Sequence, residues 1–233
     1  METNQRDRDL KILLRAIQVI GSLLLQYAVL RLAAGTRLWL WMWVYFLLYV
    51  IGVLFVSQLF LRRIPETVAK RSETNDMKGW DKIVGGMWTW THFILLPLIA
   101  GLDFRFGWTQ GYPLEMHEFG IIFFVIGFAL FCWALFENAY FSTVVWVQVE
   151  SGQNVCESGP YEIVRHPGYT GACLQSLGTG MILGSWWGLG VAIVAIALLV
   201  WRTQLEDAAL LKELPGYNEF SHHVKYRLLP RLW

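Results

Sequence analysis

Residues 38–61 read LWLWMWVYFLLYVIGVLFVSQLFL, a run of 24 residues that contains no charged side chain. A helix needs roughly 20 predominantly apolar residues to cross the hydrocarbon core of a bilayer, and this run is long enough. Trp39, Trp41 and Trp43 lie near one end of the run, as is typical of aromatic rings at a membrane–water interface. The stretch therefore predicts a transmembrane helix and indicates a membrane protein.

Five further apolar stretches approach the same length, and they cover residues 12–33, 83–101, 119–136, 168–184 and 186–203. The chain of 233 residues is 55% hydrophobic and only 16% charged, whereas soluble domains carry about 25% charged residues. A soluble core of this size cannot bury so much apolar surface. The sequence therefore predicts an all-α membrane bundle of about six transmembrane helices, followed by an amphipathic helix that starts at Tyr217 and ends at Pro230.

The distribution of basic residues predicts the orientation of this bundle. Six spans put both termini and the loops 62–82 and 137–167 on one side of the membrane. That side holds 16 of the 19 Lys and Arg residues, and the other side holds only Arg31, Arg37 and Arg105. Because short loops rich in Lys and Arg stay in the cytoplasm, both termini and the C-terminal amphipathic helix are expected to be cytoplasmic.

The composition also argues against several classes of protein and site. A net charge of +1 excludes a polybasic nucleic-acid binder. The cysteines Cys132, Cys156 and Cys173 form no C-x-x-C pair, so neither a disulfide framework nor a thiolate zinc site is predicted. The sequence has no H-x-x-x-H or H-E-x-x-H pattern, and the adjacent His222 and His223 would face different directions on a helix. No metal is therefore expected.

Residues able to do chemistry concentrate after Phe136, on the predicted cytoplasmic side. Residues 148–169 read QVESGQNVCESGPYEIVRHPGY and lead into the fifth span through Arg165, His166 and Pro167. Proline is natural in the first turn of a helix, and an interfacial arginine can extend to the lipid headgroups. The segment therefore permits a purely structural interpretation as well as a binding site.

The sixth span ends in a second group of charged residues. Arg202 and Glu206 are four residues apart, so they project from the same face of the helix, and Asp207 follows directly. Such a pair is usually a solvated salt bridge. Here it lies where a lipid-covered helix leaves the membrane and charge is costly, so a functional role is equally open.

Features inside the spans also have two interpretations. His92 lies within the third span, in which Pro97 predicts a kink, and is either a functional residue or a packing histidine. Small residues recur at intervals of four through the fifth span and into the sixth, and this pattern favours close helix packing over a cofactor contact. These residues are Ser176, Gly180, Gly184 and Gly188.

Several motifs together resemble one known family. They are Gly159-Pro160-Tyr161, Arg165-His166-Pro167-Gly168-Tyr169, Arg202 with Glu206-Asp207, and Tyr217 with residues 226–233. The combination resembles the isoprenylcysteine carboxyl methyltransferase family, which belongs with the phospholipid methyltransferases among membrane enzymes that use S-adenosylmethionine. The resemblance covers about residues 119–233. It implies a membrane scaffold in residues 1–118 and a methyltransferase core in residues 119–233.

The resemblance also implies roles for individual residues. Those that would bind S-adenosylmethionine are Gln148, Asn154, Val155, Tyr161, His166, Pro167, Gly168, Tyr169 and Glu206. Glu206 would bind its amino group. Arg202 would bind a carboxylate of the substrate, and Arg165 would lie near the reaction centre, so Arg202, Arg165 and Glu206 form the expected catalytic set.

The chemistry of methyl transfer bears on the acceptor. Transfer from a sulfonium chiefly requires that two reactants be positioned in line. A carboxylate acceptor, such as a prenylcysteine-like group, needs only an orienting cation such as Arg202. An amine or thiol acceptor must lose a proton to a base, and the sequence offers no clear candidate. The expected acceptor is lipophilic and enters from the bilayer.

Two other functions remain open on the sequence alone. A membrane reductase of the sterol-reductase type, using a nicotinamide cofactor, would have a similar C-terminal region, although the chain lacks a G-x-G-x-x-G turn. A non-catalytic membrane module could bind haem or a quinone through His92, His117 and His166.

Overall fold

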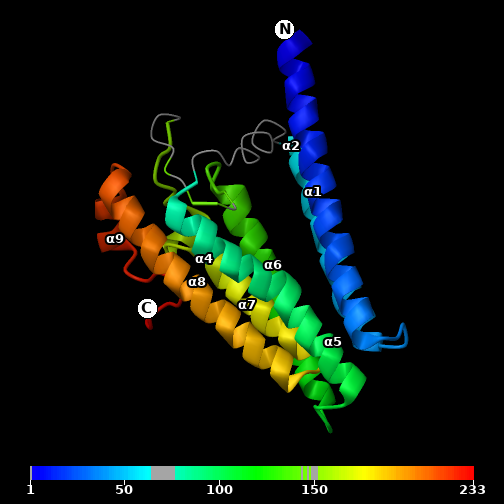
Figure 1. Ribbon diagram of the computed structural model, residues 1–233. Helices are drawn as coiled ribbons and strands as arrows, with labels where there is room; N and C mark the ends of the chain where they lie inside the picture. The colour runs from blue at the N-terminus through cyan, green and yellow to red at the C-terminus, as the bar shows by residue number, and fades with distance from the viewer. Residues whose placement is uncertain (1, 64–76, 143, 146, 148–151) are drawn as a thin grey trace.

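The computed structural model describes residues 2–63, 77–142, 144–145, 147 and 152–233, and in these ranges the only regular structure is helical. Figure 1 shows the arrangement of the helices. They are α1 (Glu2–Ala34), α2 (Leu40–Arg63), α4 (Gly79–Trp90), the π-helix η1 (Thr91–Leu95), α5 (Leu96–Phe106), α6 (Leu114–Glu137), the 3₁₀-helix η3 (Gly159–Glu162), α7 (Pro167–Ile182), α8 (Trp186–Glu213) and α9 (Tyr217–His223). The predicted all-α class is confirmed.

Five segments among the described residues are long and apolar enough to cross a membrane. They are Ala16–Ala34, Leu40–Gln58, Gly79–Phe106, Leu114–Glu137 and Trp186–Glu213. The remaining expected span corresponds to α7, which has 16 residues and is therefore about 24 Å long. This helix is shorter than a lipid-exposed span, and most of its residues are buried against neighbouring helices. The chain is thus a polytopic helical membrane protein.

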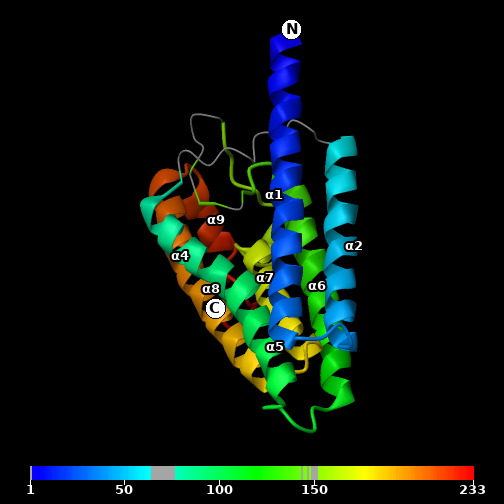
Figure 2. The same ribbon diagram turned by 45° about the vertical axis from the view of Figure 1, so that its right-hand side comes forward.

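Successive long helices alternate in direction (Figures 1 and 2). The start of α1, the end of α6, the start of α7 and the end of α8 consequently lie at the same end of the bundle. Helices α1 and α2 form a hairpin beside the main body, in which α7 lies between α6 and α8 (Figure 2). The chain segments with the most polar residues therefore meet at one end of the molecule.

Glycines bring α6 and α7 into backbone contact. A Cβ atom on Gly127 would lie 2.5 Å from the carbonyl oxygen of Gly171, and one on Gly178 would lie 2.6 Å from that of Gly120. Gly120 and Gly127 of α6 therefore face Gly171 and Gly178 of α7, with the same spacing of seven residues on each helix. This close packing fixes α7, and with it the start of α7, relative to the end of α6.

The stripe of small residues predicted for the α7–α8 hairpin is divided among several neighbours. A Cβ on Gly180 would lie 3.0 Å from Cα of Leu189, which is the expected close approach to α8. Gly184 makes the turn with a φ of +70°, and a Cβ there would lie 2.4 Å from Cε1 of His117. Gly188 packs against Ala100 of α5 instead. These small residues have a packing role, and they contact three different helices, α8, α6 and α5.

The predicted kink in the third span takes the form of a π-helical turn. Pro97 is the second residue of α5 and cannot donate a backbone hydrogen bond, so the preceding turn, η1, widens. His92 lies in this turn, is buried, and has its Nδ1 2.9 Å from Oγ of Ser176 on α7. This bond gives His92 the role of a packing histidine.

The C-terminal helix is shorter than predicted. It ends at His223 rather than at Pro230, because the following residues run back to the start of α7. The carbonyl of Tyr226 accepts from the backbone N–H of Arg165 at 2.9 Å, and that of Arg227 accepts from the N–H of His166 at 2.9 Å. These bonds satisfy backbone groups that precede the first turn of α7, and a helix continued to Pro230 could not make them.

Candidate active site

A cavity of about 770 Å³, including its mouth toward solvent, lies at the polar end of the bundle. It is bounded by the chain after α6, the segment 153–156, η3, the start of α7, the end of α8 and α9. Nearly all the elements that form it come from the C-terminal half of the chain.

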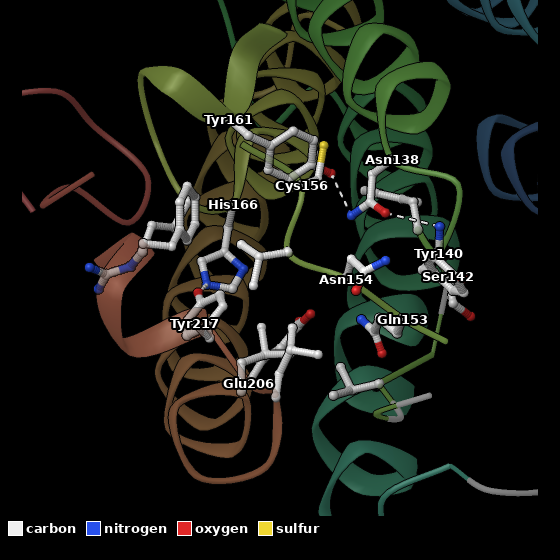
Figure 3. A pocket seen from close by; sticks show the side chains of 18 of the residues that line it. Asn138, Tyr140, Ser142, Gln153, Asn154, Cys156, Tyr161, His166, Glu206 and Tyr217 are labelled. Carbon is white, nitrogen blue, oxygen red and sulfur yellow. Dashed lines mark hydrogen bonds between the residues drawn. The ribbon is translucent and has the colours of Figure 1, made fainter. Parts of the chain in front are cut away.

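Figure 3 shows how the polar side chains surround this cavity. His166 and Tyr217 lie on one side, Tyr161 lies at one end, and Glu206 lies at the other end. The side opposite His166 carries Asn138, Tyr140, Ser142, Gln153 and Asn154. The cavity therefore combines one carboxylate with several neutral hydrogen-bonding groups.

The structure brings most of the predicted site residues to this cavity. Those that line it are Asn154, Val155, Tyr161, Arg165, His166, Gly168, Tyr169 and Glu206. Pro167 is the first residue of α7 and is not part of the lining, and neither is Arg202. Gln148 lies outside the described residues.

Asp207 is the centre of a buried polar cluster behind the cavity, a role that the sequence did not reveal. Its carboxylate accepts from Nε and Nη2 of Arg165, both at 2.9 Å, and from the hydroxyl of Tyr217 at 2.8 Å. It also accepts from Nε of Arg227 at 2.8 Å and lies 3.2 Å from Nε2 of His166. Asp207 is 1% exposed, so it ties the starts of α7 and α9 and the C-terminal tail to α8.

Helix geometry explains why adjacent acids on α8 have different roles. Successive helical residues point about 100° apart, so Glu206 faces the cavity while Asp207 faces the cluster behind it. The pair Glu206-Asp207 was visible in the sequence. Its spacing alone could not tell which acid meets the arginines.

Arg165 is held by this cluster. Besides its two bonds to Asp207, Nη1 of Arg165 lies 3.3 Å from the carbonyl oxygen of Ser221, 3.1 Å from that of Val224 and 3.4 Å from that of Lys225. The guanidinium is therefore directed at the end of α9. These contacts hold the end of α9 against the chain that leads into α7.

Arg202 pairs with Asp81 of α4, a contact that the sequence did not indicate. Nε and Nη2 of Arg202 donate to the two carboxylate oxygens of Asp81 at 2.7 Å and 2.8 Å, and both residues are buried. Asp81 also accepts from the backbone N–H of Val145 at 2.8 Å. An acid at the edge of a predicted span, such as Asp81, indicates a polar contact. The sequence could not show that this contact is with Arg202, which lies 121 residues away.

Tyr169 connects this ion pair to the cavity. Cζ of Arg202 lies 5.2 Å from the centroid of the Tyr169 ring, and the Tyr169 hydroxyl donates to the carboxylate of Glu206. Arg202 and Glu206 share a helix face, as predicted, but each has its own partner and Tyr169 lies between them. The chain Asp81–Arg202–Tyr169–Glu206 thus links α4 to the wall of the cavity.

Burial and charge keep two cavity side chains protonated. The pKa of Tyr217 is raised, first by burial and then by the nearby carboxylate of Asp207. The pKa of Cys156 is also raised by burial, with the acids Glu137 and Glu157 adding to the effect. Tyr217 is therefore a hydrogen-bond donor to Asp207, and Cys156 is a neutral thiol.

The histidines proposed for haem or quinone lie in three separate environments. His92 bonds to Ser176, and Nδ1 of His117 is 2.8 Å from the carbonyl oxygen of Ile182 beside the stacked ring of Trp41. His166 lies next to Asp207. Within the described ranges, no group of three or more His, Cys, Asp or Glu side chains is placed to hold a metal ion.

Comparison with known proteins agrees with the motifs. Residues 116–214 match the phospholipid methyltransferase family. Protein-S-isoprenylcysteine O-methyltransferase B of Arabidopsis thaliana is 27% identical over 144 residues, which cover 57% of this chain and 71% of the plant protein. The matched family region contains Tyr161, the Arg165–Tyr169 motif, Arg202 and Glu206, and thus much of the cavity wall. The predicted resemblance is confirmed, and the chain is an integral membrane protein whose residues 116–214 match the phospholipid methyltransferase family.

Proposed function

We propose that this protein is a membrane methyltransferase that binds S-adenosylmethionine in the cavity beside Glu206 and methylates a lipophilic acceptor. The observation that carries the proposal is the position of Glu206. This carboxylate faces the cavity within the region that matches the methyltransferase family. Tyr169, from the Arg165–Tyr169 motif, donates a hydrogen bond to it.

The cavity residues fit the chemical parts of the donor. A carboxylate at one end suits the ammonium of the methionine portion. Polar side chains such as Asn154 and the apolar surfaces of Val155 and Tyr161, which line the same cavity, suit the adenosine portion. When bound, the donor supplies an electrophilic methyl group on a sulfonium.

The protein's own residues would position this donor. Glu206 would hold the ammonium, and the Tyr169 hydroxyl would orient Glu206. Gly168 allows the ring of Phe141 to lie against the start of α7, because a Cβ there would be 2.4 Å from Cε2 of Phe141. The start of α7 and the chain after α6 together would exclude water from one side of the reacting group.

The orientation predicted from the basic residues agrees with this assignment. The cavity lies at the end of the bundle where α1 begins and α8 ends (Figure 1). Both termini are therefore proposed to be cytoplasmic, and the cavity would open toward the compartment that supplies the soluble donor. The bilayer around the exposed apolar helices would supply the lipophilic acceptor.

The direct test is incubation of the purified protein with a total lipid extract and S-adenosylmethionine that carries a deuterated methyl group. Mass spectrometry should find a lipid that gains one labelled methyl group. Glu206→Gln removes the charge while keeping the side-chain size, so the affinity for the donor should fall by about 10- to 100-fold.

Glu213→Gln is the matched control, because Glu213 lies on the same helix but is bonded at the surface to Lys78. This variant should retain normal donor binding and labelling. Unchanged donor affinity and labelling in Glu206→Gln would contradict the site assignment. Binding of NADPH with no binding of S-adenosylmethionine would favour the reductase alternative instead.

A further inference from the structure

We propose that His166 is the general base of the reaction and that the methyl acceptor carries a proton on nitrogen or sulfur. The inference rests on the proposed function and narrows its substrate class. It starts from two observations. The arginines expected near the acceptor are bonded to acids, and one imidazole nitrogen faces the cavity.

The cation expected to hold an acceptor carboxylate is already paired. Arg202 donates to both oxygens of Asp81 and is not part of the cavity wall. Arg165 donates to both oxygens of Asp207 and to carbonyls at the end of α9. Removing either buried acid from its arginine would leave an uncompensated charge, at considerable cost. A carboxylate acceptor would therefore find its expected cations engaged.

His166 has one ring nitrogen bonded and the other directed at the cavity. Nε2 lies 3.2 Å from Asp207 and 3.3 Å from the hydroxyl oxygen of Tyr217. Since the carboxylate of Asp207 can only accept, Nε2 carries a proton, and in the neutral form of the imidazole Nδ1 then has a free lone pair. Nδ1 has no hydrogen-bond partner among the described residues, and Figure 3 shows this side of the ring turned toward the space between Glu206 and Asn154.

The position of His166 at the start of α7 leaves Nδ1 free. His166 precedes the first helical residue, Pro167, yet its side chain makes no capping hydrogen bond to the helix. Tyr169 stacks on the imidazole with ring centroids 5.8 Å apart and planes 5° apart. The ring is therefore fixed in orientation by Asp207, Tyr217 and Tyr169, as a positioned base requires.

The charged groups around His166 balance one another. Arg165 and Arg227 donate to Asp207, and Glu206 lies at one end of the cavity. The phenols of Tyr217 and Tyr169 contact the ring, and Tyr161 and Cys156 line the same cavity. The contacts thus place two cations and two anions near the imidazole, so its surroundings carry no net charge from these four groups.

The number of protons released distinguishes an acceptor with a proton on nitrogen or sulfur from a carboxylate acceptor. An ammonium or thiol acceptor gives its proton to Nδ1 of His166, and its nitrogen or sulfur lone pair forms the new bond to the methyl carbon. The carbon–sulfur bond of the sulfonium breaks, and its electron pair stays on the donor sulfur as a neutral thioether. One proton is released per methyl group transferred. A carboxylate acceptor releases none and yields an ester.

The first test uses a total lipid extract and S-adenosylmethionine labelled in the methyl group. Alkaline treatment of the labelled products should leave the label attached, because N-methyl and S-methyl groups resist hydrolysis. Release of the label as methanol would identify a methyl ester and overturn the inference, while the proposed methyltransferase function would stand. Failure to label any lipid would count against the proposed function itself.

The second test separates a base from a donor-binding residue. His166→Gln keeps an N–H that can donate to Asp207 but has no basic nitrogen. The turnover rate should fall by roughly 100-fold or more, and the rise of the rate with pH should disappear, while the KM for S-adenosylmethionine stays close to that of the wild type. His222→Gln, in the exposed part of α9, should behave as the wild type. A raised KM with an unchanged rate and pH profile would overturn the inference.

A third measurement needs no activity. Nitrogen-15 NMR of the histidine-labelled protein, without donor and at a pH at which imidazoles are neutral, should show an imidazole with its proton on Nε2 that is absent from His166→Gln. Assignment of His166 to the tautomer with its proton on Nδ1 would contradict the proposal.

Discussion

At the scale of single residues, the site depends on buried carboxylates that each satisfy several donors. Asp207 neutralises Arg165 and Arg227 and orients His166 and Tyr217. A buried acid of this kind is costly to remove, because the arginines lose their counter-charge and their hydrogen bonds. The strongest effects of single substitutions on stability are therefore expected in this cluster.

Asp207→Asn should lower the free energy of unfolding by about 3–5 kcal/mol, because two guanidinium groups would lose their shared anion. The loss is measured as a lower midpoint of thermal unfolding in detergent. Glu213→Gln at the surface of the same helix should shift the midpoint little. Equal midpoints for the two variants would show that the cluster is not a stabilising centre.

Asp81→Asn should also reduce stability and donor binding, because it leaves Arg202 buried without its full counter-charge. Adding Arg202→Gln should recover part of the lost stability, since the remaining partners are then both neutral. The check is a double-mutant cycle on thermal unfolding and on donor affinity. Additive losses in the double variant would argue against coupling between α4 and the cavity wall.

At the scale of elements, glycines decide how closely α6 and α7 approach. Gly127 and Gly171 lie in mutual backbone contact, and a Cβ on Gly171 would lie 2.5 Å from the carbonyl oxygen of Gly127. The cavity is framed by the chain that follows α6 and by the start of α7. A wider separation of the two helices would therefore displace the site residues as well.

Gly171→Ala should destabilise the protein by roughly 1–3 kcal/mol, because the added methyl group overpacks a rigid helix contact. Gly190→Ala on α8 is the control, because a Cβ there would meet no atom within 4 Å. That control should be neutral or slightly stabilising, since alanine favours a helix. Thermal unfolding of both variants measures the difference, and a tolerated Gly171→Ala would refute the contact.

At the scale of the whole molecule, the alternation of helix directions brings the start of α1, the end of α8 and the cavity to the same end of the bundle (Figures 1 and 2). The excess of Lys and Arg on that side predicts that it is cytoplasmic. The path of the chain decides which basic residues share a side, and their charge then predicts which side is cytoplasmic.

A cysteine introduced at Glu219, in α9, should react with a membrane-impermeant maleimide only after the cells are permeabilised. One at Gln110, in the exposed turn at the opposite end, should react in intact cells. Both would be made with Cys156 replaced by serine to remove a partly exposed native thiol. The reverse labelling pattern would invert the proposed orientation.

Much of this architecture could be predicted from the sequence by itself. The length and apolar character of each span depend on neighbouring residues, so the all-α membrane class and most helix positions follow from local pattern. The Arg165–Tyr169 motif and Glu206 could also be recognised from local sequence, because they lie in two short segments. The α7 helix was predicted as a further span, but its small residues pack it inside the bundle, where a shorter helix suffices.

Only the tertiary structure decided which acidic side chain pairs with which arginine. Asp81 and Arg202 are 121 residues apart, and Asp207 rather than Glu206 faces the arginines because of the rotation of α8. The early end of α9 likewise depends on backbone bonds between the C-terminal tail and the start of α7. Local sequence determines which segments are helical and apolar. The pairing of distant polar groups is set by helix packing, because a buried charge is stable only beside the partner that the fold brings to it.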